Sequence, residues 1–563
     1  MDGIALEILW SRLISIANQG AATLLRTSFS TVVGSAQDFK YILADANGAS
    51  LATSDAGAVE FVVTFPRCLK SMLEVFPPEQ LEPGDVLVTN DPWLCAGHYN
   101  DIHVATPVFH RGRLVAFAGS VIHISDIGGR YASYDATEVY EEGLCLPIMK
   151  LYRRGIASDD IFQILMANVR APDMQLGDVR AMVTGNEVGA RLLVEFLEEY
   201  GLEDLTEISE AVQSRVEQAI RAAISLLPDG SYEHETWVDG YELDVRIKSQ
   251  ITITGDELVV DYTGSSPQTN RASINCVLNL TQATTLHPLK AILAPHIPAN
   301  EGAIRPIRVT APEGSILNAQ RPAPVRSRSM VSLLVPDHIL GALAQICPER
   351  VTAEMGTRWF LMGDRAPRNG KRVIASFFQA GAMGAGLHKD GPSAKFFPIM
   401  ASHTPVELFE RSTNLLVVEK NLRPDSGGPG RFRGGCGQRI TIENHDETPV
   451  VFTFWRPRVR HPAQGVFGGA PGAPGRPTLN GRPIEAGRFR LEQGDTAELL
   501  TPGGGGYGDP HTRDPRRILD DVIDGYVTMQ QAIDQYGVQV DPIAHSIEPT
   551  EKRTAGQGLT LRI

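Results

Sequence analysis

The spacing of apolar and polar positions divides the first quarter of the chain into helical and strand-like segments. Apolar residues recur at helical spacing over residues 4–26 and 65–76, which predicts two amphipathic helices. Short apolar runs bounded by turn residues predict a hairpin over residues 41–53 and strands over residues 86–89, 103–109 and 114–122. This region is therefore predicted to mix helices and strands.

The period changes twice along the middle of the chain. Helical spacing predicts helices over residues 159–169, 177–200 and 207–227. A period of two then begins at about residue 230 and predicts strands over residues 245–248 and 251–262, around a turn at 254–256. Residues 290–330 contain many prolines and are predicted to be mostly loop, followed by a helix over 331–347 and a strand over 373–379.

The C-terminal third is rich in glycine and proline. Strands are predicted over residues 439–444, 450–455 and 496–500, and closing helices within 514–536. The last ~25 residues are polar and are predicted to be disordered. Together the patterns predict an α+β chain with mixed sheets and a helical middle segment. The predicted regions are an α/β region (1–228), a mixed middle region (229–420), a β-rich region with closing helices (421–540) and a tail (541–563).

Composition narrows the class of protein. A chain of 563 residues exceeds what one hydrophobic core usually serves, so several subdomains are expected. The net charge of −14 argues against nucleic acid or an anionic membrane as a partner, and no apolar run is long enough to span a membrane. The six cysteines are scattered without a CxxC pair, and the N-terminus lacks the pattern of a signal peptide. These features predict a soluble cytoplasmic protein with reduced thiols.

The strongest candidate chemistry lies between Asn90 and Gly129. Two histidines are each followed three residues later by an aspartate, as His98/Asp101 and His123/Asp126. Neutral imidazole together with carboxylate suits a divalent metal such as zinc, iron or manganese. A single His-x-x-Asp pair is usually a cap or a surface feature. Two pairs in one stretch, both beside glycines and at predicted strand ends, favour a metal site.

Three further carboxylates have open roles. Asp91, in the turn Asn90-Asp91-Pro92, is a possible ligand, a carboxylate that orients a ligand, or only a turn former. Asp38 and Glu60 lie upstream, and only the fold can bring them to the same place.

Other chemistries have weaker support. Cys95 lies between Asp91 and His98 and is a candidate nucleophile, although inert buried cysteines are far commoner than catalytic ones. No Gly-x-Ser-x-Gly elbow, phosphate-binding Gly-x-x-x-x-Gly-Lys-Ser/Thr loop or dinucleotide-binding Gly-x-Gly-x-x-Gly motif after a strand is present. The glycine-rich stretch 502–510 is better explained as a structural loop. A requirement for ATP would therefore be met by another chain.

Ordered motifs along nearly the whole chain carry a family resemblance. They are Leu25-Arg26-Thr27-Ser28-Phe29-Ser30, Asp38-Phe39, Pro83-Gly84-Asp85, Asn90-Asp91-Pro92, Gly97-His98, Asp126-Ile127-Gly128-Gly129, Glu142-Gly143-Leu144, Asn168-Val169-Arg170, Asp261-Tyr262-Thr263-Gly264-Ser265, Ser426-Gly427-Gly428-Pro429-Gly430 and Tyr536-Gly537-Val538. In these motifs the chain resembles the hydantoinase B family. That family supplies the partner subunit of ATP-dependent N-methylhydantoinases, 5-oxoprolinases and caprolactamase-like enzymes, and is related more distantly to acetone and acetophenone carboxylases.

The resemblance implies a division of labour between two subunits. An actin-like hydantoinase A-type partner would bind Mg-ATP and phosphorylate the substrate amide oxygen or bicarbonate, within a hetero-tetramer or larger assembly. This chain would hold a zinc, manganese or iron ion, which polarises a carbonyl or activates water. The ligands that the resemblance implies are Asp38, His98, Asp101 and His123, with Asp91 and Asp126 as catalytic or supporting carboxylates.

The resemblance also has departures that leave the substrate open. The family often has a histidine where Val59-Glu60-Phe61 stands, and a second histidine where Ile124 follows His123. Cys95-Ala96-Gly97 replaces a glycine-rich, threonine-containing stretch. The expected function is cyclic-amide hydrolysis of a hydantoin, lactam or 5-oxoproline-like ring. The alternatives are a subunit of an ATP-dependent ketone carboxylase and a non-catalytic scaffold for the ATPase subunit.

Overall fold

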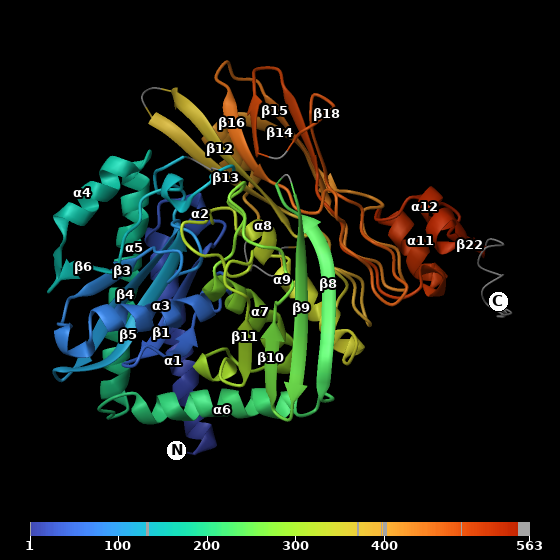
Figure 1. The fold of residues 1–563 in the computed structure, drawn as a ribbon. Helices are drawn as coiled ribbons and strands as arrows, with labels where there is room; N and C mark the ends of the chain where they lie inside the picture. Colours follow the sequence, from blue (N-terminus) through green and yellow to red (C-terminus); the bar gives the residue numbers. More distant parts are fainter. Residues whose placement is uncertain are drawn as a thin grey trace.

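A seven-stranded antiparallel sheet organises the N-terminal part of the computed structural model, which describes residues 2–130, 134–241, 243–368, 371–395, 397, 402–485 and 487–549 (Figure 1). Its order is β2-β1-β5-β4-β3-β6-β7. The strands are β1 (Phe39–Asp45), β2 (Ser50–Thr53), β3 (Val86–Thr89), β4 (Asp101–His110), β5 (Arg113–His123), β6 (Met149–Arg153) and β7 (Ile156–Ala157). The predicted hairpin and the three predicted strands are confirmed.

Both faces of this sheet are covered, because side chains alternate along each strand. Ile102 and Val104 of β4 face a core that includes α1 (Gly3–Thr27) and α5 (Pro172–Glu199). Ala105 of β4 faces a second core, which includes α3 (Phe61–Val75). The predicted first helix is confirmed, and α3 begins four residues before its predicted start.

A close approach seats α3 on the sheet. Gly119 of β5 has no side chain, and a Cβ there would lie 1.9 Å from Cζ of Phe65. The ring of Phe65 in turn stacks on the imidazole of His103, with centroids 6.3 Å apart. Phe65 thus packs against β5 at Gly119 and against β4 at His103.

A four-stranded sheet, β11-β10-β9-β8, forms the middle part, and α6 runs beneath it and the N-terminal sheet (Figure 1). Only the pair β10/β11 is parallel. The elements of this part are α6 (Thr206–Ile224), β8 (Gly230–Asp239), β9 (Asp244–Thr254), β10 (Glu257–Asp261), α7 (Leu278–Leu293), β11 (Ile307–Thr310), α8 (Ser329–Ser332) and α9 (Val335–Leu343). Two further helices, α2 (Thr31–Gly34) and α4 (Asp159–Asn168), belong to the N-terminal part.

The structure corrects the prediction for this middle part at two places. Helix α7 was not predicted from its spacing, because it is buried on most sides and lacks a clear polar face. The segment predicted to be helical over 331–347 is helical as far as Leu343, but in two pieces, α8 and α9, with a break at Leu333–Leu334. Pro336 stands in the first turn of α9, where its missing N–H is tolerated and where helices often begin.

Two antiparallel sheets and a small helical unit form the C-terminal part. The sheets have the orders β13-β12-β16-β19 and β14-β15-β20-β17-β18 and share a core of aromatic and aliphatic residues. The elements are β12 (Arg358–Arg368), β13 (Lys371–Ala380), α10 (Val406–Thr413), β14 (Leu415–Leu422), β15 (Gln438–Asn444), β16 (Val450–Trp455), β17 (Arg476–Leu479), β18 (Arg482–Pro483), β19 (Gly487–Leu491), β20 (Thr496–Leu500), α11 (Pro515–Ile523), α12 (Met529–Tyr536), β21 (Val538–Asp541) and β22 (Ser546–Pro549). Short 3-10 helices lie at Pro78–Gln80, Val139–Glu141, Glu301–Ala303, Pro348–Arg350 and Pro510–Thr512.

The predicted tail needs a correction. Its first residues are not irregular, because β21 and β22 form a hairpin that packs against α11 and α12. Residues 550–563 lie outside the described residues. Along the described ranges, no helix combines the length and apolar character needed to cross a membrane. The α+β class with several sheets is confirmed, whereas the division at residues 228, 420 and 540 stays a prediction.

Candidate metal centre

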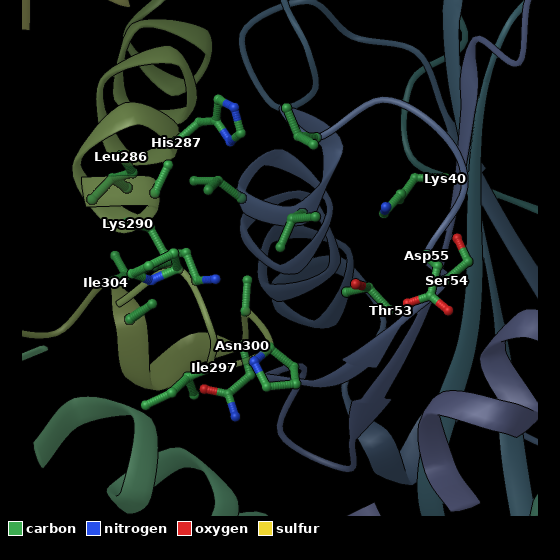
Figure 2. A pocket seen from close by; sticks show the side chains of 18 of the residues that line it. Lys40, Thr53, Ser54, Asp55, Leu286, His287, Lys290, Ile297, Asn300 and Ile304 are labelled. Atoms are coloured by element: carbon green, nitrogen blue, oxygen red, sulfur yellow. The ribbon is translucent and has the colours of Figure 1, made fainter. Parts of the chain in front are cut away.

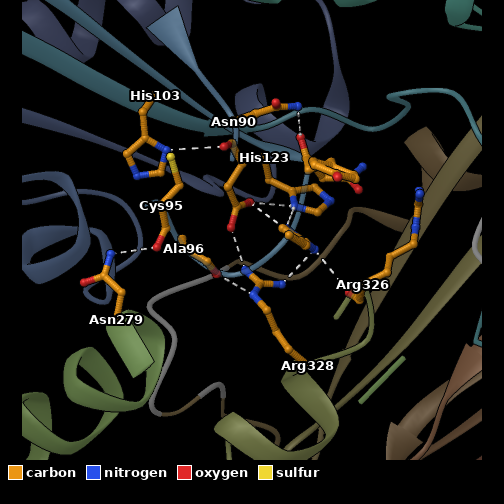
Figure 3. A network of polar contacts seen from close by, with 12 residues as sticks. Asn90, Cys95, Ala96, His103, His123, Asn279, Arg326 and Arg328 are labelled. Atoms are coloured by element: carbon orange, nitrogen blue, oxygen red, sulfur yellow. Dashed lines mark hydrogen bonds and ion pairs between the residues drawn. The ribbon is translucent and has the colours of Figure 1, made fainter. Parts of the chain in front are cut away.

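Three buried side chains converge where β4 begins and β5 ends (Figure 3). Nε2 of His98 lies 2.7 Å from Oδ1 of Asp101. Nδ1 of His123 lies 3.1 Å from the same carboxylate oxygen and 3.2 Å from Nε2 of His98. Two imidazole nitrogens and one carboxylate oxygen therefore face a common point.

Strand register brings these residues together. Asp101 is the first residue of β4, His123 is the last residue of β5, and the two are paired across the ladder. His98 lies in the turn before β4. Its neighbour Gly97 has φ +90°, and a Cβ there would lie 2.8 Å from Cδ of Arg328. Both the backbone conformation and the space therefore require glycine at this position.

Long-range hydrogen bonds anchor the loop that carries His98 (Figure 3). Nδ2 of Asn90 donates to the carbonyl of Tyr99 at 2.7 Å, and Nδ2 of Asn279 donates to the carbonyl of Cys95 at 2.7 Å. Nε of Arg328 donates to the carbonyl of Ala96. The loop is thus held to β3, α7 and the segment before α8, which limits the positions that His98 can take.

The three residues fit a divalent transition metal. Ligand atoms about 2.1 Å from a tetrahedral ion are separated by about 3.4 Å. Two of the observed separations, 3.1 and 3.2 Å, are close to this value, and the third, 2.7 Å, is shorter. His98 also has a partner suited to a ligand, because the carbonyl of Arg326 lies 3.1 Å from its Nδ1. An Nδ1–H that donates to this carbonyl leaves a lone pair on Nε2, the usual arrangement of metal-bound histidine.

Electrostatics favour the protonation states that bind a cation. Burial and the nearby Arg328 lower the pKa of His98 to about 3, so its imidazole is neutral at pH 7. Burial opposes ionisation of Asp101, but His98 and Arg328 outweigh it and hold the pKa of this carboxyl well below its usual value. His98 is therefore a neutral imidazole and Asp101 a carboxylate, which are the charge states that bind a cation.

Arg328 orients the carboxylate of Asp101. Its Nη2 donates to Oδ2 at 2.5 Å, so Oδ1 is left to face the two histidines. Its Nη1 also lies 2.8 Å from Nδ1 of His98. The contacts of Nδ1 with Arg328 and with the carbonyl of Arg326 require opposite tautomers, and only the second leaves Nε2 free to coordinate.

The centre opens on a cavity of about 30 Å³. Asp38, Glu60 and Arg358 are among the residues that line it. The carbonyl of Asp38 accepts from the backbone N–H of His123 at 3.0 Å, so pairing of β1 with β5 places Asp38 at the centre. Its carboxylate is not one of the three converging ligand groups. Burial and the charge of Asp38 raise the pKa of Glu60 to about 7.

Glu142 holds the segment that covers the centre. Its Oε1 accepts from the backbone N–H groups of Val325 at 2.8 Å and Arg326 at 2.9 Å. Its own carbonyl accepts from Nη1 of Arg326. Burial raises the pKa of Glu142 to about 8 despite these N–H donors. Glu142 thus positions the carbonyl of Arg326 against His98.

Glu142→Gln is expected to flatten the pH dependence of stability. The folded state holds the Glu142 proton more tightly than the unfolded state, so this stabilisation is complete below pH 4.5 and is lost as pH rises through about 8. Each unit of pKa corresponds to about 1.4 kcal/mol. Urea unfolding at pH 5 and pH 8 should show a fall in unfolding free energy that is smaller in Glu142→Gln by about 1–3 kcal/mol. An equal fall in both proteins would contradict the assignment.

Asp126 and Asp91 occupy different positions from the three converging residues. Asp126 is fully buried, and its Oδ1 accepts from Nη1 of Arg170 at 2.7 Å and from the N–H of Gly128 at 3.2 Å. Oδ1 of Asp91 accepts from the N–H of Trp93 and from Nη2 of Arg321. Within the described lining of the cavity, neither aspartate contributes. Their contacts indicate structural roles.

Asp126→Asn is expected to separate stability from metal binding. Loss of the buried pair with Arg170 should lower the unfolding free energy by about 3 kcal/mol. Metal content of the folded variant should stay at the wild-type level, because Asp126 has other partners. Asp256→Asn, which weakens an exposed pair with Arg221, should change stability by less than about 1 kcal/mol. Loss of metal from an Asp126→Asn chain of unchanged stability would return Asp126 to the centre.

Cys95 is poorly suited to nucleophilic catalysis. It is fully buried, and its Sγ lies 3.3 Å from Sγ of Cys68. Burial and Cys68 raise the pKa of its thiol well above the usual value, so the reactive thiolate is disfavoured. Cys95 packs in the core behind the centre and is not part of the described cavity lining.

Several residues at the centre were not predicted from the sequence. Arg326, Arg328 and Arg358 line the cavity, and Glu142 supports it. Arg326 and Arg328 stand in the proline-rich segment predicted as loop, where two arginines separated by one serine were the available signal. Glu142 appeared only within a family motif, and nothing in the local pattern marks Arg358.

Comparison with known proteins finds one protein family along most of the chain. The Hydantoinase B/oxoprolinase family model matches residues 2–510. Caprolactamase subunit beta of Pseudomonas jessenii is 31% identical over 569 residues, which cover 96% of this chain and 97% of that protein.

Two solved structures are similar along almost all of the chain. ATP-dependent caprolactamase from Pseudomonas jessenii has a TM-score of 0.89 at 28% identity, covering 99% of each chain. Nucleotide-free acetone carboxylase has a TM-score of 0.87 at 21% identity, covering 99% of this chain and 82% of that one. The second likeness concerns the fold alone.

Proposed function

Since the chain belongs to the hydantoinase B/oxoprolinase family, we propose that it is the metal-containing subunit of an ATP-dependent cyclic-amide hydrolase. The observation that carries this proposal is the convergence of His98, Asp101 and His123 beside a buried cavity. The proposed substrate is a hydantoin, a lactam or a 5-oxoproline-like ring.

The chain's own residues supply binding and orientation at the centre. His98, Asp101 and His123 would hold the metal, and Asp38 is the proposed fourth donor from the same cavity. When bound, a zinc, manganese or iron ion would polarise the substrate carbonyl or lower the pKa of a water molecule. Arg328 keeps one oxygen of Asp101 directed toward the two histidines. The buried walls limit access of bulk water to the reacting group.

ATP would be bound and used by a partner chain. Hydrolysis of an unactivated ring amide is helped when its oxygen is first phosphorylated, and this sequence has no recognised phosphate-binding loop. The proposed partner is an actin-like, hydantoinase A-type subunit that binds Mg-ATP, in a hetero-tetramer or larger assembly. The description of the caprolactamase relative as a beta subunit supports a partner.

Co-expression with such a partner tests the proposal. ATP-dependent ring opening by the purified pair, together with a stoichiometric transition metal in this chain, is the expected result. Bicarbonate-dependent product formation from a ketone would instead identify a carboxylase subunit. An active pair whose turnover is unaffected by complete removal of the metal would leave this chain as a scaffold.

A further inference from the structure

A cavity of about 480 Å³ lies between α3, α7 and the β1–β2 hairpin (Figure 2). This volume is within the usual range of small-molecule sites, whereas the cavity beside the metal centre has a volume of only about 30 Å³. Figure 2 shows Lys40 on one side of this cavity and His287 and Lys290 on the opposite side. The cavity therefore combines room for an organic molecule with several polar groups.

The charge of this lining is positive. Lys40 is only 3% exposed, and its Nζ donates to the carbonyl of Ala56 at 3.2 Å. Neither Lys40 nor Lys290 forms an ion pair with the residues that the structure describes. Asp55 is the only carboxylate in the described lining; it is exposed, and it accepts from Nδ2 of Asn18 at 2.7 Å. Two ammonium groups thus lack a contacting counter-charge, in a chain of net charge −14.

Both ammonium groups act on the same imidazole. Burial, then Lys290 and then Lys40, lower the pKa of His287 to about 4, so this histidine is neutral. Lys290 belongs to α7 and Lys40 to β1, which means that the two walls direct positive charge into one space. Lysine ammonium groups can only donate hydrogen bonds, and they bind oxyanions most strongly.

The cavity adjoins the metal centre. Val59 and His287 of its lining also line a small intervening cavity, to which Glu60, Arg328 and Arg358 contribute. These last three residues also line the metal cavity. A small cavity that shares lining residues with each of them therefore lies between the large cavity and the metal cavity.

We propose that the 480 Å³ cavity is an oxyanion-binding site, in which Lys40 and Lys290 hold a small phosphate- or carboxylate-bearing molecule next to the metal centre. The identity of the ligand rests on the proposed function: opening an amide ring yields a carboxylate, and ATP consumption yields phosphate. The charge and size of the site do not depend on that function.

Titration calorimetry of the full chain with inorganic phosphate, and separately with glutarate, tests the proposal. At least one of the two anions is expected to bind, and Lys290→Met and Lys40→Met should each weaken that binding at least tenfold. Lys290→Arg keeps the charge and should retain most of the affinity. Lys248→Met is the matched control, because it removes an equal charge that is paired with Glu233 at 3.0 Å on the middle sheet.

Every outcome bears on the site. Binding of phosphate alone indicates a phosphoryl ligand, and binding of glutarate alone indicates the ring-opened product. Absence of binding, or equal losses in Lys290→Met and Lys248→Met, would overturn the proposal. If Lys290→Met folds poorly, the affinity of Lys40→Met is compared with that of the wild type. Equal affinities would also overturn the proposal. Lysine-dependent binding in a chain that shows no ATP-dependent ring opening would reject only the proposed function.

Discussion

Replacing His123 by alanine is expected to remove the bound metal and, under the proposed function, to lower ATP-dependent ring opening by the chain and its partner strongly. His123 supplies one of three convergent ligand atoms, and its Nδ1 lies 3.1 Å from Asp101. Loss of a residue that only supports a metal ligand commonly lowers metal affinity or activity 10- to 100-fold. Loss of a ligand itself should therefore lower turnover by at least about 100-fold. Elemental analysis and a coupled assay on the same preparation measure both effects.

The control for this variant is another histidine-to-alanine change. His445 is exposed and pairs with Glu443 on the surface of the C-terminal part, so His445→Ala should keep full metal content and turnover. Circular dichroism must show that His123→Ala is folded. A folded His123→Ala chain with wild-type metal content and turnover would reject the metal centre and the function derived from it.

Replacing Arg328 by methionine is expected to cause the largest loss of stability in the metal-free chain. Arg328 and Asp101 form a buried ion pair at 2.5 Å, and Arg328 also contacts His98 and the carbonyl of Ala96. Methionine fills similar volume but leaves the carboxylate of Asp101 without its cation. Breaking such a pair from one side costs about 3–5 kcal/mol. Urea unfolding in the presence of a chelator measures the loss.

A double-mutant cycle tests whether this loss comes from the pair. Asp101→Asn and Arg328→Met each leave one partner of the ion pair without the other, whereas the double variant removes both charges. The double variant should therefore lose about 1–3 kcal/mol less than the sum of the single losses. Additive losses would show that Arg328 stabilises the chain only through its contact with the loop before His98.

Much of the fold was predictable because its information is local. Side-chain period and turn residues identified α1, the β1–β2 hairpin and strands β3 to β5. Where the signal is not periodic, prediction was poorer, because α7 is apolar on most sides. Spacing also did not show the break at Leu333–Leu334, just before Pro336 in the first turn of α9.

The core of the candidate centre was also available from local sequence. His98, Asp101 and His123 lie on a turn and on two strands joined by a hairpin, so neighbouring segments bring them together. The same reasoning could not assign Asp126. It follows β5 by three residues, but the chain turns there, and the carboxylate meets Arg170 from the loop before α5.

The sequence by itself determined most of the elements and the family, and it included the three convergent residues among its candidate ligands. Only the tertiary structure decided what surrounds them. Arg328, more than 200 residues from Asp101, directs that carboxylate, and Lys290 meets Lys40 across a cavity. Periodicity reports which face of an element is buried but not which distant segment covers it. Which segment covers it depends on packing between surfaces that are remote in the sequence. Here such segments bring Arg326, Arg328 and Arg358, and with them most of the positive charge, to the candidate site.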